Sequence, residues 1–81
     1  MKVKVYSLPA CGACNHLKDF LKEKGIEYEE LNVADQEIAK EMVEKSGQMS
    51  LPVTIVEKNG KEEVLLGYND SVKAKLKELK G

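Results

Sequence analysis

The pattern of apolar and polar residues changes once in the first part of the chain, at a pair of cysteines. Residues 2–7 alternate and carry β-branched and aromatic side chains, which predicts a strand. Its two faces are expected to be Val3, Val5 and Ser7, and Lys2, Lys4 and Tyr6. Beyond a loop marked by Pro9 and Gly12, apolar side chains recur at helical intervals at Ala13, Leu17, Phe20 and Leu21. Gly25 supplies the stop signal for this helix.

Three further strands are predicted downstream. The first covers residues 27–33. Its apolar members are Tyr28, Leu31 and Val33. The second covers residues 53–57, and Asn59-Gly60 is a strong hairpin signal that leads to the third strand at 62–66.

Two more helices are predicted from capping signals and helical spacing. Asp35 is a suitable N-cap for the first of them, and Ser46-Gly47 ends it. Its buried stripe is expected to contain Ile38, Ala39, Met42 and Val43. Asn69 or Asp70 caps the last helix. The inward-facing side chains of that helix are expected to be Val72, Leu76 and Leu79.

The predicted order of elements is β-α-β-α-β-β-α, which indicates the α/β class. The first two strands are joined through a helix and should be parallel with a right-handed crossover. The last two form a hairpin, so the four-stranded sheet is mixed and has helices on both faces. No repeat or linker interrupts the pattern, and we expect a single domain over residues 1–81.

Composition and charge narrow the functional classes. The chain has 42% hydrophobic and 33% charged residues with a formal net charge of −1, which argues against a nucleic-acid or membrane-surface binder. The alternating N-terminus has no apolar stretch typical of a secretion signal, and no segment approaches the roughly 20 residues of a membrane helix. We therefore expect a cytoplasmic protein. Two cysteines in a reducing compartment are catalytic or metal-binding more often than structural.

The cysteines form the motif Cys11-Gly12-Ala13-Cys14, at the junction between the first strand and the first helix. A thiolate is stabilised at a helix N-terminus, where unpaired backbone N–H groups and the helix dipole favour negative charge. Cys11 is expected to be the exposed nucleophile that attacks a disulfide. Cys14, about one turn further and deeper, is expected to be the resolving thiol that attacks Cys11 and releases the reduced substrate.

Other interpretations of the motif stay open at this point. The cysteines could be half of a zinc site, but structural zinc needs four ligands and the only other soft donor is His16. They could also be two core cysteines, although the strand–CxxC–helix context argues against that reading. His16 is expected to lie on the surface rather than to act as a general base, since two residues along a helix from Cys14 it points away from it.

A second candidate feature is Ser50-Leu51-Pro52-Val53, which places a proline directly before a strand. A trans proline at a strand start is the ordinary arrangement. If the Leu51–Pro52 bond is cis instead, the backbone of Leu51 is presented towards the cysteines. An extended substrate could then bind by strand addition.

Together, the element order, the CxxC motif and Ser50-Leu51-Pro52 resemble the glutaredoxin branch of the thioredoxin superfamily over essentially the whole chain. The resemblance implies a thioredoxin-like fold, a redox-active CxxC pair and a cis Pro52. It also implies that Gly67-Tyr68-Asn69-Asp70 occupies the place of the family's glycine-rich stretch before the last helix. Asp70 would there meet the amino group of glutathione.

The departures from that family point to a neighbouring group. Leu8 stands where many glutaredoxins carry a lysine for glutathione, and Tyr68 fills the place of the second late glycine. The chain is also similar to the short glutaredoxin-like redoxins that donate electrons to ribonucleotide reductase. Their late Gly-Phe motif is echoed by Gly67-Tyr68, although their usual tryptophan is absent.

The expected function is that of a thiol–disulfide oxidoreductase, a monomeric dithiol donor that reduces protein disulfides. Thioredoxin reductase or glutathione would supply the electrons, and ribonucleotide reductase is one expected acceptor. No tightly bound cofactor or metal is expected, with glutathione only as a co-substrate. The expected partner surface comprises Leu8, Pro9, Ala13, Leu51 and Tyr68. The alternatives are glutathione-dependent reduction of mixed disulfides, and iron–sulfur carriage by Cys11 from two chains with two glutathiones.

Overall fold

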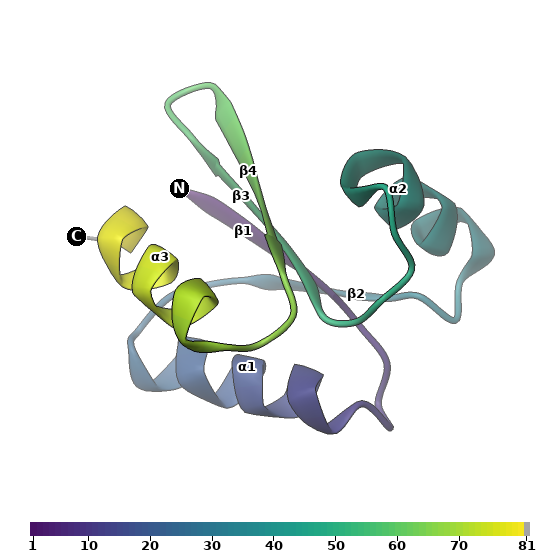
Figure 1. Cartoon of the computed structure of the whole chain (residues 1–81), viewed down its shortest axis with the longest axis horizontal. Helices are drawn as coiled ribbons and strands as arrows, with labels where there is room; N and C mark the ends of the chain where they lie inside the picture. Colours follow the sequence, from purple (N-terminus) through teal and green to yellow (C-terminus); the bar gives the residue numbers. More distant parts are fainter. Residues whose placement is uncertain (81) are drawn as a thin grey trace.

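Alternating strands and amphipathic helical segments give the chain one sheet covered by helices (Figure 1). The computed structural model describes residues 1–80. Its elements are β1 (Lys2–Ser7), α1 (Gly12–Glu23), β2 (Glu29–Asn32), α2 (Gln36–Ser46), β3 (Val53–Lys58), β4 (Lys61–Leu66) and α3 (Asp70–Lys80). This order is the predicted one.

The four strands lie in the order β2-β1-β3-β4. β1 runs parallel to β2, with Tyr6 opposite Leu31, and antiparallel to β3, with Val5 opposite Thr54. β3 and β4 form an antiparallel hairpin. Its turn uses Asn59 and Gly60, both with positive φ, as the Asn-Gly signal predicts. The predicted mixed sheet is therefore confirmed.

The helices divide between the two faces of the sheet (Figure 1). α1 and α3 cover one face, where the larger cluster of buried side chains contains Val3, Val5, Leu17, Phe20, Leu21, Ile26, Val56, Val72 and Leu76. α2 covers the other face, where the smaller cluster contains Tyr6, Met42, Val53 and Ile55. The central strands β1 and β3 thus contribute to both clusters.

Side-chain caps set where α2 and α3 begin. The Asp35 carboxylate accepts hydrogen bonds from the backbone N–H groups of Glu37 (2.9 Å) and Ile38 (3.4 Å), which confirms it as an N-cap. For α3 the cap is Asn69, whose Oδ1 accepts from the N–H of Val72 at 3.0 Å. Asp70 is then the first residue of the helix.

Ala13, which is expected on the partner surface, is exposed, because the buried line of α1 passes through Cys14, Leu17 and Leu21 at i, i+3 and i+7 and leaves Ala13 outside it. Two other details differ from the sequence-based prediction. In α2 only Met42 is fully buried, and the other predicted members of its stripe are half-buried. β2 is shorter than predicted, since Tyr28 lies before it and packs on the larger cluster.

The alternation in β1 also holds only in part. Lys2 is exposed and Lys4 half-buried, but Tyr6, on the same face, is fully buried. The reason is that α2 covers this face towards the end of the strand, where Tyr6 packs with Met42. The end of β1 is consequently covered on both sides.

We expect Leu17→Ala to lower the free energy of unfolding by about 2–5 kcal/mol, the range for removing a fully buried leucine side chain. Leu17 belongs to α1, the helix that begins at the cysteine motif, and is fully buried in the larger cluster. Urea unfolding followed by circular dichroism measures the loss. Leu66→Ala, at a side chain 43% exposed on β4, is the matched control and should lose clearly less. Equal losses in the two variants would contradict this packing.

A second prediction concerns stability at high pH. Burial raises the pKa of Tyr6 from 10.0 to about 12, and the negative charge of Glu41 adds to the effect. The unfolded chain ionises this hydroxyl first, so its contribution is intact below about pH 10 and is lost as the pH rises towards about 12. Relative to Tyr6→Phe, the wild-type chain should lose about 2 kcal/mol over that interval. Unfolding free energies measured across the interval would contradict the prediction if the two curves ran parallel.

Candidate active site

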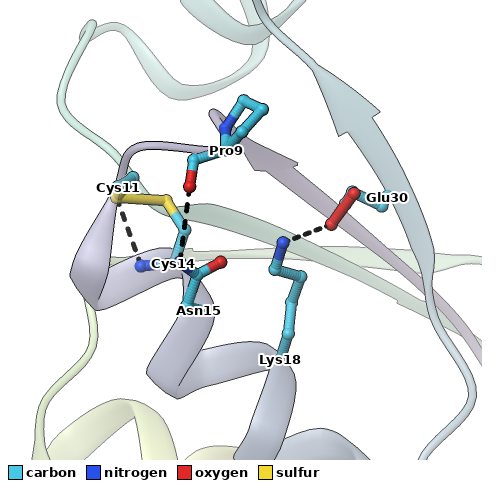
Figure 2. Close-up of a disulfide and its surroundings, with 6 residues drawn as sticks. All are labelled: Pro9, Cys11, Cys14, Asn15, Lys18 and Glu30. Atoms are coloured by element: carbon cyan, nitrogen blue, oxygen red, sulfur yellow. Dashed lines mark hydrogen bonds and ion pairs between the residues drawn. A yellow bond between two sulfur atoms is a disulfide. The ribbon is translucent and has the colours of Figure 1, made fainter.

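The loop between β1 and α1 is fixed by its own hydrogen bonds (Figure 2). The backbone N–H of Cys11 donates to the carbonyl of Leu8 at 3.0 Å, which closes a turn before the helix. The side-chain amide of Asn15, in the first turns of α1, donates back to the carbonyl of Pro9 at 3.4 Å. These contacts hold the cysteine motif between the end of β1 and the start of α1.

Cys11 is the N-cap of α1. Its backbone is extended (φ −83°, ψ 109°), and its Sγ accepts a hydrogen bond from the backbone N–H of Cys14 at 3.2 Å. The first turn of α1 contains no acidic residue. The positive end of the helix dipole and the N–H group of Cys14 are therefore both directed at Cys11, an arrangement that stabilises a thiolate there.

The two cysteines are joined in a disulfide, with their Cα atoms 5.2 Å apart. This separation lies within the range that an unstrained backbone allows for a disulfide. The burial of the two side chains is unequal, because Cys11 is only half-buried whereas Cys14 is 0% exposed. An external thiol or disulfide can thus reach Cys11 but not Cys14.

The Leu51–Pro52 peptide bond is cis. Pro52 is buried at the start of β3, and its carbonyl accepts a hydrogen bond from the N–H of Gly67 at 2.8 Å. Leu51 is half-buried and packs against the smaller cluster. Two segments that the sequence singled out separately, around Pro52 and around Gly67, are therefore joined directly.

Tyr68 connects the segment after β4 to the helix that carries the cysteines. Its ring lies 6.4 Å from the imidazole of His16 at an interplanar angle of 15°, and 6.2 Å from the ring of Phe20. The ammonium of Lys73 lies 5.0 Å from the centre of the same ring. Tyr68 is half-buried and His16 is exposed, so the pair forms an aromatic surface along one flank of α1.

The last two predicted site residues are Asp70 and Leu8. Asp70 begins α3 with a fully exposed carboxylate, 3.9 Å from the ammonium of Lys73. Leu8 is half-buried in the loop before Cys11. An apolar side chain thus lies in the loop three residues before the nucleophile.

Lys18 and Glu30 are two residues that the sequence analysis did not single out. The Lys18 ammonium and a Glu30 carboxylate oxygen form an ion pair of 2.5 Å that joins α1 to β2, one helical turn after Cys14 (Figure 2). The available signal was the spacing, because Lys18 is four residues after Cys14 and shares its side of the helix. The partner Glu30 could not be identified without the register of β2.

Within residues 1–80, no group of three or more His, Cys, Asp or Glu side chains is placed to hold a metal ion. The same residues contain no helix with the length and apolar character needed to cross a membrane.

Comparison with known sequences identifies relatives along most of the chain. The glutaredoxin family model matches residues 3–61. A glutaredoxin-like 8.6 kDa protein in the rubredoxin operon of Clostridium pasteurianum is 35% identical over 68 residues, which are 83% of this chain and 85% of that protein.

Solved structures show the same fold. The glutaredoxin of Archaeoglobus fulgidus is 31% identical with a TM-score of 0.74, over 95% of this chain and 83% of that one. The thioredoxin-like protein BC3987 is 29% identical with a TM-score of 0.77, over 95% and 97% of the two chains. NrdH-redoxin from Escherichia coli is similar in fold, with a TM-score of 0.73 at 24% identity over 91% and 93%.

These matches and the geometry of the site agree. The family model spans both cysteines and Pro52, and the aligned structures share the sheet and helices that position them. The chain therefore belongs to the glutaredoxin family of the thioredoxin superfamily, whose members are thiol oxidoreductases.

Proposed function

We propose that this protein is a dithiol electron donor that reduces disulfides in other proteins. The observation that carries the proposal is the unequal placement of the two cysteines. Cys11 caps α1 and is accessible, whereas Cys14 is fully buried within bonding distance of it. Nucleophilic attack needs access and a stabilised thiolate, while resolution needs proximity and protection.

The reaction follows from this placement. The Cys11 thiolate attacks one sulfur of the substrate disulfide, forms a mixed disulfide and releases the other substrate sulfur as a thiolate. Cys14 then loses its proton and attacks the Cys11 sulfur. The Cys11–Cys14 bond forms, the bond to the substrate breaks, and the second substrate thiolate leaves and takes up a proton. Two electrons pass from the dithiol to the substrate.

The surroundings of Cys11 fit a protein substrate. Leu8 and Pro9 precede it in the loop and Ala13 follows it in the first turn of α1, and these apolar or small side chains are half-buried or exposed. We assign the backbone of Leu51 at Pro52 to pairing with an extended substrate segment, and Gly67 and Tyr68 to the border of the binding surface. Exposed apolar groups next to a reactive thiol favour docking of a polypeptide.

We further propose that thioredoxin reductase is the electron source and ribonucleotide reductase an acceptor, in a cytoplasmic setting. Support comes from Leu8, an apolar side chain in place of a lysine for glutathione, and from Asp70, whose carboxylate already lies near Lys73. It also comes from the similarity to NrdH-redoxin, a glutaredoxin-like protein with a thioredoxin-like activity profile. Asp70 remains the residue that would bind glutathione if glutathione is the reductant.

NADPH-coupled reduction of insulin disulfides tests this proposal in two arms, one with thioredoxin reductase and one with glutathione and glutathione reductase. We expect turnover with thioredoxin reductase alone. Turnover only in the glutathione arm would replace the proposed electron source with glutathione. No turnover in either arm, with both thiols shown to be reduced, would overturn the reductase proposal. Iron–sulfur carriage would then be the remaining candidate function, visible as a brown colour in fresh protein.

Replacing Cys11 and replacing Cys14 should have different effects in the same insulin assay. Cys11→Ser should lose at least about a thousandfold in rate, since no nucleophile remains. Cys14→Ser should still form a mixed disulfide with the substrate, detectable by mass, but should not turn over protein disulfides. Accumulation of a mixed disulfide on Cys14 in the Cys11→Ser variant would reverse the assignment.

Tyr68→Ala should raise the KM for a protein disulfide several-fold while leaving kcat nearly unchanged. The ring lies on the flank of the cysteine-bearing helix, so its loss removes contact area for the partner but no reacting group. Tyr28→Ala is the matched control, because Tyr28 is also a half-buried aromatic on the larger cluster but precedes β2. An unchanged KM in Tyr68→Ala would exclude Tyr68 from the docking surface.

A further inference from the structure

The resolving cysteine faces a physical difficulty that the nucleophile does not. Cys14 is 0% exposed, whereas its attack on Cys11 requires the thiolate form. A thiolate in an apolar environment is disfavoured unless a positive charge or a hydrogen-bond donor is close. The helix N-terminus stabilises a thiolate at Cys11, since the N–H of Cys14 donates its hydrogen bond to the Cys11 sulfur. Cys14 therefore needs a separate source of stabilisation.

Lys18 is placed to supply it. Positions 11, 14 and 18 are spaced i, i+3 and i+7, so the three side chains leave α1 along one line of its surface. Residues at i and i+4 on a helix have Cβ atoms about 5–6 Å apart. The Lys18 side chain is only 17% exposed, which keeps its ammonium close to the protein rather than in bulk water.

The partner of Lys18 comes from another element. Glu30 lies on β2, opposite Val5 of β1, and its carboxylate pairs with the Lys18 ammonium next to the turn that carries Cys14 (Figure 2). The Glu30 side chain is 47% exposed, so this anion is well hydrated and does not depend on Lys18. The ammonium can thus be shared with a second anion at small cost.

The other elements packed around α1 offer fewer charges. On the opposite flank, His16 is engaged with Tyr68, and Lys73 of α3 lies over the same ring. Beneath the helix, β1 and β3 present the uncharged pair Val5 and Thr54. Asp19 on α1 is exposed. Lys18 is therefore the charged residue of α1 on the line of the two cysteines, and Glu30 of β2 is its ion-pair partner.

We propose that Lys18 is a positioning residue for the resolving step. The Glu30 carboxylate partly offsets the effect of the Lys18 ammonium on the Cys14 thiolate. When Cys11 carries the substrate, the Cys14 proton passes to solvent and the Lys18 ammonium stabilises the thiolate. The thiolate then attacks the Cys11 sulfur and expels the substrate thiolate. This inference rests on the proposed dithiol mechanism, but its tests need neither a protein substrate nor a reductase.

The first test titrates Cys14 alone, in a Cys11→Ser background where serine can still cap α1. Thiolate absorbance in the ultraviolet gives the titration midpoint. Adding Lys18→Gln should raise the midpoint by about one pH unit, the lower end of the effect of a neighbouring opposite charge. Lys18→Arg should restore it, and Glu30→Gln should lower it. Lys22→Gln, one turn further along α1, is the matched control and should leave it unchanged.

The second test follows the resolving step in the chain with both cysteines. Reduced protein mixed with an aromatic disulfide releases one yellow thiol when Cys11 attacks and a second when Cys14 resolves. A midpoint raised by one pH unit lowers the thiolate fraction about tenfold but makes the thiolate about threefold more nucleophilic. Lys18→Gln should therefore slow the second release about threefold at neutral pH, with the first release unchanged.

The results separate this inference from the proposed function. Equal midpoints for Lys18→Gln and Lys22→Gln would overturn the role of Lys18 even if insulin reduction works as proposed. A raised midpoint that Lys18→Arg does not restore would overturn it too, since it would indicate a change of packing rather than of charge. The expected shifts would support the role of Lys18 even if insulin reduction failed in both arms.

Discussion

Burial of one side of α1 against the sheet is the constraint on which the rest of the site depends. Leu17 and Leu21 are fully buried between the helix and β1, and they fix both the position and the rotation of α1. Given that rotation, Cys14 continues the buried line into the first turn, and Cys11 is left at the open end as the N-cap. The unequal access of the two sulfurs is thus a consequence of packing and not of any feature of the cysteines themselves.

The second constraint on the site is the hydrogen bond that the Gly67 N–H donates to the Pro52 carbonyl. A proline has no N–H of its own, but its carbonyl remains free to accept. Here the acceptor ties the start of β3 to the residue that follows β4. Gly67 has φ +77°, a conformation that a residue with a Cβ adopts only under strain, which allows the chain to turn towards α1. Tyr68 is thereby placed against Phe20 and His16.

Much of the fold and of the candidate site was predictable from local sequence signals. Period-two and helical spacing gave the element order, Asp35 and Asn59-Gly60 gave a cap and a turn, and the CxxC motif gave the reactive pair. Local patterns are insufficient where tertiary contacts decide. Ala13 follows the helical spacing of α1 but lies outside its buried line, and Tyr6 is on the lysine face of β1 but is covered by α2. The ion pair of Lys18 with Glu30 depends on strand register, which no local pattern contains.

The two flanks of α1 therefore have different chemistry next to the same disulfide. Towards α3, the contacts of His16 and Phe20 with Tyr68 are aromatic, largely insensitive to salt, and partly open to a partner. Towards β2, the contact of Lys18 with Glu30 is ionic, and Lys18 is four residues after Cys14 on the same side of the helix. An aromatic surface can add contact area for a docked protein without altering thiol ionisation, whereas a charge can alter ionisation without contacting the partner. This separation allows partner recognition and the resolving chemistry to change independently.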